Sequence, residues 1–144
     1  MTKYFVIITA ALLWLMVNLS AEECRSVPEI IKSIEEEHIN TLSFREMVDF
    51  EYHRYHLYDK ALNTVYLRLK EKIKGKKRDA LISAQKMWIK FRDAEFKLFD
   101  QLYSIDCIDF RLMKVGNNIK VVRKRLEELG EFESLLDDHF SEGE

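Results

Sequence analysis

Residues 43–75, SFREMVDFEYHRYHLYDKALNTVYLRLKEKIKG, decide the fold of this chain. The stretch opens with Ser43-Phe44-Arg45-Glu46, a capping box in which a serine and a glutamate three residues later bond to each other's backbone at a helix start. One face of the helix is then marked by apolar residues that step by three and four: Tyr55, Tyr58, Leu62, Val65 and Leu69. We therefore predict a long helix that ends with Gly75 as its C-cap.

Three more helices are predicted on either side of this stretch. The first covers residues 28–39 and begins at Pro28, which helices accept in their first turn. The next covers residues 78–104, with a seam of Leu81, Ala84, Trp88, Phe91, Glu95, Leu98, Leu102 and Ile105. The last covers residues 108–129 and is expected to end at Gly130, with a seam of Ile108, Leu112, Val115, Ile119, Val122, Leu126 and Leu129. A break near Gly116 is an open alternative.

The connection between the two long helices is short, and short connections make antiparallel neighbours. The chain has one proline and four glycines, too few for the frequent turns of a β-sandwich. The predicted fold class is therefore all-α, a small antiparallel helical bundle of three to four helices.

The beginning of the chain has the pattern of a secretory signal peptide. Lys3 precedes the apolar residues 4–17, and small residues follow up to Ala21. An uncleaved anchor is the weaker interpretation, because a spanning helix needs about 20 apolar residues. We expect a signal peptide over residues 1–21, a helical domain over 22–130 and an acidic, frayed C-terminal tail over 131–144. The protein would be secreted or periplasmic, without a membrane span after cleavage.

Two cysteines, Cys24 and Cys107, remain after this cleavage. Export makes a disulfide between them permissible, and two cysteines allow only one pairing. Two free thiols are the alternative, since the sequence does not fix the distance between them.

Enzyme chemistry is not expected. The chain lacks both glycine-rich phosphate-loop patterns. Asp49, His53 and His56 share a helix face, but HExxH and Glu-x-x-His motifs are missing, so no metal site is predicted. The net charge of −2 does not indicate a nucleic-acid binder. We therefore predict no catalytic residues, no metal and no cofactor.

The most specific polar string lies on the two long helices. Asp59, Asn63 and Tyr66 share one face of the first. The second carries a matching face of Gln85, Trp88, Arg92 and Glu95. In a hairpin these faces meet, and Arg92 is expected to reach Asp59 or Asn63. Two interpretations stay open: a polar zipper that fixes helix register, or a groove that presents Arg92 or an acid to a partner.

The strings D-x-x-L-N-x-x-Y at residues 59–66 and Q-x-x-W-I-x-F-R-D-A at residues 85–94, with Glu46-Met47 upstream, resemble the LprI-type lysozyme inhibitor family of secreted bacterial proteins. The resemblance implies a helical, exported protein that inhibits lysozyme. It also implies a divergent member, because Phe50 and Phe96 stand where the family usually has cysteines.

The predicted function is an exported binding protein that inhibits lysozyme or a related muramidase by occluding its cleft. The alternative is a periplasmic or secreted interaction module, an envelope adaptor or host-directed factor, with a different protein partner. A basic tip at the helix turn is either a solvated turn or a contact for an anionic surface: Lys74, Lys76, Lys77 and Arg78. The acidic tail would attract cationic animal lysozymes. The oligomeric state is left open by the heptad seams.

Overall fold

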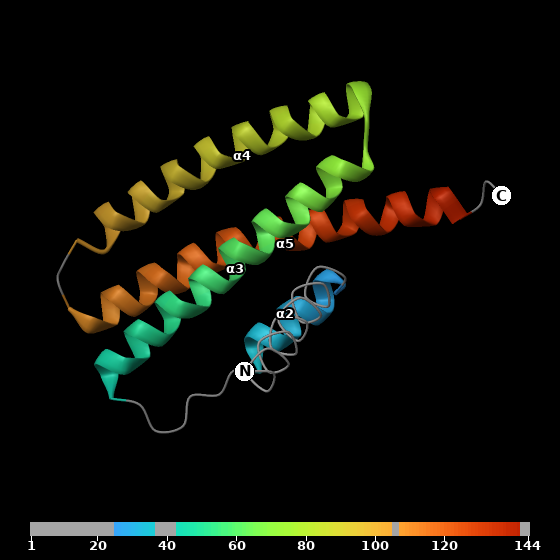
Figure 1. Ribbon diagram of the computed structural model, residues 1–144. Coiled ribbons are helices and arrows are strands. Elements are labelled where there is room, and N and C mark those ends of the chain that lie inside the picture. Colours follow the sequence, from blue (N-terminus) through green and yellow to red (C-terminus); the bar gives the residue numbers. More distant parts are fainter. Residues whose placement is uncertain (1–24, 37–42, 105–106, 142–144) are drawn as a thin grey trace, which may run out of the picture.

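The computed structural model describes residues 25–36, 43–104 and 107–141. These residues form four helices without a strand: α2 (Val27–Glu35), α3 (Phe44–Lys72), α4 (Gly75–Leu102) and α5 (Ile108–Ser141). Figure 1 shows them as one bundle, which confirms the all-α prediction. The predicted signal peptide and Cys24 lie outside the described residues, so cleavage and the disulfide to Cys107 remain predictions.

The two central helices, α3 and α5, run side by side in the same direction (Figure 1). Ion pairs show this register: Arg68 meets Glu133, and one turn further along both helices Lys72 meets Asp137. Helix α4 returns antiparallel to both. Helix α2 is also antiparallel, because its start lies at Gly130 and its end, Glu35, lies at Arg123.

The core is formed by the apolar seams of α3 and α5, closed on one side by α2. The α3 seam predicted from the sequence is buried, with Tyr58, Leu62, Val65 and Leu69 at most 2% exposed. The α5 seam is buried from Val115 to Leu129, and its most exposed buried member, Ile119, is 7% exposed. Full burial of such a side chain is worth about 1.5–3 kcal/mol, so these seams are the main source of stability.

The predicted capping box at the start of α3 is present. The backbone N–H and the hydroxyl of Ser43 donate to Glu46 Oε2 at 2.7 and 2.6 Å. The same arrangement opens α2, where Ser26 donates to Glu29 Oε2 at 2.9 and 2.8 Å. Hydrogen bonds from the serine hydroxyl, and then from its backbone N–H, hold the pKa of Glu46 below its ordinary value.

The prediction that Gly75 caps the end of α3 is wrong. Helix α3 ends at Lys72 with Ile73 as its C-cap, and Gly75 is the first residue of α4. Its φ of +55° lies in the left-handed region, which costs glycine little. The glycine therefore makes the reversal between the two helices rather than terminating the first one.

The prediction that the last helix ends at Gly130 is also wrong. Helix α5 continues through Gly116 and Gly130 to Ser141. Residues 131–141 are therefore helical, where a frayed acidic tail was expected. Contacts with the rest of the bundle stabilise this last part of the helix, since Leu136 packs on the core and Glu133 pairs with α3.

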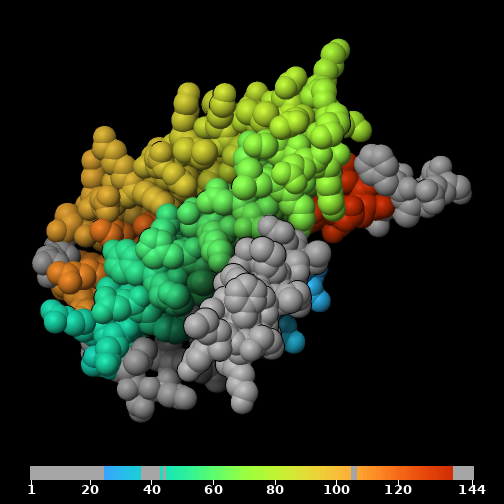
Figure 2. Space-filling view, viewed as in Figure 1, coloured from blue at the N-terminus to red at the C-terminus, as the bar shows by residue number. Residues whose placement is uncertain are grey.

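The seam predicted for α4 faces the core only in part: Leu81 and Trp88 pack against it, but the later members do not. Phe91, Leu98 and Leu102 are 54%, 45% and 62% exposed. The face toward the bundle is formed by Leu81 and Trp88 together with Gln85 and Phe96, which were not in the predicted seam. The packed face and the predicted seam share Leu81 and Trp88 and diverge after Trp88, where Phe96 packs on the core and Phe91 does not. The side chains of α4 project along one edge of the molecule (Figure 2). Ile105, the last predicted seam residue, lies outside the described ranges.

Candidate functional site

The polar faces of α3 and α4 meet at Arg92 and Asp59. A terminal nitrogen of Arg92 lies 3.8 Å from Asp59 Oδ1, and the two side chains are 23% and 33% exposed. The expected contact between these residues is therefore present, as a partly buried ion pair. The distance to Asp59 is too long for a hydrogen bond, and Arg92 instead donates one to its neighbour Asp93 at 2.7 Å.

Aromatic rings hold the Arg92 guanidinium in place. Its carbon lies 5.5 Å from the Trp88 ring centre and 5.7 Å from that of Phe96. Phe96 in turn packs edge-on against Tyr55 of α3 at 6.0 Å. A cation flanked by two rings and two carboxylates is well fixed, which suits a residue that sets the register of α3 and α4.

The other α3 members of the string do not join this contact. The side-chain amide of Asn63 is exposed and donates to the backbone oxygen of Asp59 at 2.9 Å, within its own helix. The ring of Tyr66 lies under the ammonium group of Lys70 at 5.7 Å. Glu95 is half-buried. The predicted string is thus one local contact with flanking residues rather than a continuous zipper.

Gln85 forms a hydrogen bond with α5. Its side chain is 4% exposed, and its oxygen accepts a hydrogen bond from Arg125 Nε at 3.2 Å. Arg125 is 7% exposed and also bonds Glu128 Oε2 at 3.0 Å. The sequence interpretation missed Arg125, although its position beside Leu126 in the buried seam placed it near the core.

The four cations of the basic tip lie at the α3–α4 turn. Lys74, Lys76 and Lys77 are exposed, and Arg78 is half-buried. The tip is a compact positive surface at the end of the hairpin.

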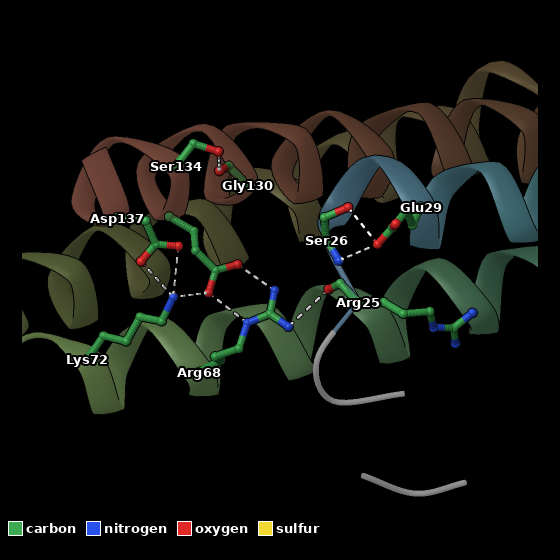
Figure 3. Close-up of polar contacts among 9 residues, drawn as sticks. Arg25, Ser26, Glu29, Arg68, Lys72, Gly130, Ser134 and Asp137 are labelled. Atoms are coloured by element: carbon green, nitrogen blue, oxygen red, sulfur yellow. Dashed lines mark hydrogen bonds and ion pairs between the residues drawn. The ribbon is translucent and has the colours of Figure 1, made fainter. Parts of the chain in front are cut away.

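A network of ion pairs at the C-terminal end of α3 was also missed (Figure 3). Arg68 donates hydrogen bonds to both carboxylate oxygens of Glu133. It also donates one to the backbone oxygen of Arg25 at 3.2 Å. Lys72 lies 3.0 Å from Glu133 and 3.0 Å from Asp137. Desolvation lowers the pKa of Lys72, but hydrogen bonds to the two carboxylates outweigh it and raise that pKa above its ordinary value. The network fastens α2, α3 and α5 together.

A groove of about 740 Å³ runs between α2 and α5. Its floor is apolar and its rim is mostly acidic. The lining consists of Val27, Pro28, Ile31, Lys32, Glu35, Glu127, Gly130, Glu131, Ser134 and Leu135.

A more polar cleft of about 440 Å³ lies at the opposite end of the bundle. Two of its lining residues, Lys114 and Asp100, pair with each other at 2.9 Å. The hydrogen bond to Asp100 raises the pKa of Lys114. This ion pair joins α4 to α5, so these two lining residues stabilise the bundle.

The part of the chain that the structure describes contains no group of three His, Cys, Asp or Glu side chains placed to hold a metal. His38 and the side chain of His139 lie outside that part. No described helix is both long enough and apolar enough to cross a membrane.

Comparison with known proteins gives one match. The family model described as "Lysozyme inhibitor LprI" matches residues 39–129, which include α3, α4 and most of α5. No curated protein matches the chain, and no solved structure does.

Proposed function

The chain belongs to the LprI lysozyme inhibitor family, and from this membership we propose that it is an exported, non-enzymatic protein that binds lysozyme or a related muramidase and occludes its cleft. The family match over residues 39–129 carries the proposal. Because this range includes α3 and most of α5, the match extends to the framework of the bundle. Export is supported by the signal-peptide pattern of residues 1–21.

The surface charge of α2 and α5 supports a cationic target. Glu127, Glu128 and Glu131 lie on α5 and Glu35 lies across from them on α2. Two arginines neutralise part of this charge, since Arg123 pairs with Glu35 and Glu127 and Arg125 pairs with Glu128. Acidic surfaces steer cationic proteins such as animal lysozymes into encounter, and the effect declines with salt. Occlusion of the cleft itself would deny the substrate access to the two catalytic carboxylates of the enzyme.

A cell-wall lysis assay tests the proposal. The protein from residue 22 to 144, shown by circular dichroism to be helical, is titrated against c-type and g-type lysozymes. We expect inhibition of at least one type at near-stoichiometric ratios. Full lysis at a large molar excess of folded protein would contradict the proposal.

The basic tip supports a second candidate function, an interaction module on the bacterial envelope. Lys74, Lys76 and Lys77 form an exposed cationic surface. Co-sedimentation with vesicles containing anionic lipid tests this alternative. Binding that is lost when the three lysines are replaced by Gln, together with full lysozyme activity, would favour the second function over the first.

A further inference from the structure

We propose that the groove between α2 and α5 is the docking surface for a basic segment of the target lysozyme. The inference rests on the proposed function and goes further, because it assigns the contact surface and the chemistry of what enters it. The occupant is a lysine or arginine side chain with its apolar stem, carried on the surface of the enzyme.

The floor of the groove suits the stem of such a side chain. Val27 and Ile31 of α2 are 4% and 8% exposed, and Leu135 of α5 is 56% exposed at the edge. Gly130 contributes no side chain to the floor, and Val27 packs directly on its backbone. Long cationic side chains bury their methylene groups against apolar surface while the charge stays at a polar rim.

The acidic rim of the groove suits the positive charge of such a side chain. Three carboxylates, Glu35, Glu127 and Glu131, line the groove together with one ammonium group, that of Lys32. Lys32 lies 3.7 Å from Glu36, outside the groove lining. Arg123 pairs with both Glu35 and Glu127, so the three carboxylates stand against two cations. The balance is still negative, with Glu131 as the main contributor, and it favours a cationic occupant.

The groove is also fixed in shape before a partner arrives. Arg123 bridges its two walls, 2.5 Å from Glu35 of α2 and 3.0 Å from Glu127 of α5. Below this bridge, Val27 packs directly against Gly130. A preformed site loses less conformational entropy on binding, so more of the contact energy appears as affinity.

The exposed apolar stripe of α4 is a less suitable surface for this target. Phe91 and Leu98 lie on it, but the same helix presents Lys86, Lys90 and Lys97 to solvent. A cationic lysozyme would be repelled there, whereas the acidic rim between α2 and α5 attracts it.

Calorimetric titration with c-type lysozyme, at low and at physiological salt, tests the inference. The groove variants are Glu131→Lys and Leu135→Ser, both at exposed positions. The matched controls are Asp79→Lys and Phe91→Ser, which make similar changes at exposed positions of α4. We expect each groove variant to weaken binding at least tenfold, Glu131→Lys to reduce the salt dependence, and the controls to bind like the unmodified protein.

The outcomes separate the two proposals. Lysozyme binding by the unmodified protein that the groove variants retain in full would overturn the groove inference and leave inhibition intact. Loss of binding in Phe91→Ser, with binding kept in the groove variants, would also overturn it and move the contact to α4. No binding by the unmodified, folded protein to any lysozyme would defeat the proposed function itself.

Discussion

Arg68 of α3 and Glu133 of α5 form a bidentate ion pair that joins the two helices. The guanidinium Nε and one terminal nitrogen donate to the two oxygens of the carboxylate, with the Nε contact at 2.7 Å. The side chains are 21% and 11% exposed, so water screens the pair only partly. The contact joins residues 65 positions apart and holds the C-terminal part of α5 against α3.

Replacement of Glu133 by Ala should lower the free energy of unfolding by about 2–3 kcal/mol, because it leaves the mostly buried guanidinium of Arg68 without its carboxylate. Urea denaturation followed by circular dichroism measures the loss. Asp137→Ala is the control, since Asp137 is 62% exposed and its pair with Lys72 should contribute less than about 1 kcal/mol. Equal effects of the two substitutions would mean that burial does not strengthen the Glu133 contacts.

Gly130→Ala should destabilise the protein although alanine is the better helix former. An added Cβ would lie 2.8 Å from Val27 Cβ and 2.9 Å from its Cγ2, so α2 must shift. We expect a loss of about 1–3 kcal/mol from this overpacking. Gly116→Ala is the matched control, because nothing lies within 4 Å of its added Cβ, and it should gain up to about 1 kcal/mol.

Thermal melts of both glycine variants check this prediction. The variant Gly130→Ala/Val27→Gly supplies a further test, since removal of the whole valine side chain, including the Cβ at 2.8 Å, restores space for the new Cβ. Its stability should be higher than the sum of the two single changes predicts. A stabilised Gly130→Ala protein would show that α2 is packed loosely on α5.

The sequence predicted the central helices well because their apolar residues offer only one helical seam. Tyr58 and Leu62 on α3 and Val122 and Leu126 on α5 are all buried as expected. On α4 the same method was right only in part, because apolar spacing did not decide which residues after Trp88 face the core. Phe96 packs against the core, whereas the periodicity placed the exposed Phe91 in the seam.

The contacts at the C-terminal end of the bundle were missed because they depend on distant residues. Residues 131–144 were interpreted as a charged tail from local composition. A signal was nevertheless present, since Arg68 and Lys72 on α3 have the same four-residue spacing as Glu133 and Asp137 on α5. Spacing of that kind predicts paired faces only once the two helices are known to run parallel. The groove between α2 and α5 likewise depends on a helix crossing that no local pattern encodes.

The capping box predicts a specific pH dependence. Hydrogen bonds from Ser43 lower the pKa of Glu46 in the folded state. Its contribution to stability is therefore present above the ordinary glutamate pKa of about 4.3 and is lost as the pH falls through the lower folded value. Glu46→Gln should have a smaller decline in melting temperature between pH 6 and pH 3 than the unmodified protein. Glu71→Gln, at the other end of α3, is the control, and parallel curves for all three proteins would contradict the prediction.

Arg92→Ala separates the structural from the partner-binding interpretation of the polar contact between α3 and α4. The substitution removes the ion pair with Asp59 and the contacts with Trp88 and Phe96, so the free energy of unfolding should fall by about 1–3 kcal/mol. Lysozyme inhibition, measured at a temperature where the variant is folded, should be unchanged, because Arg92 does not line the groove between α2 and α5. Lys90→Ala, an exposed change on the same helix, should alter neither property. Full stability of Arg92→Ala combined with lost inhibition would instead place Arg92 in contact with the enzyme.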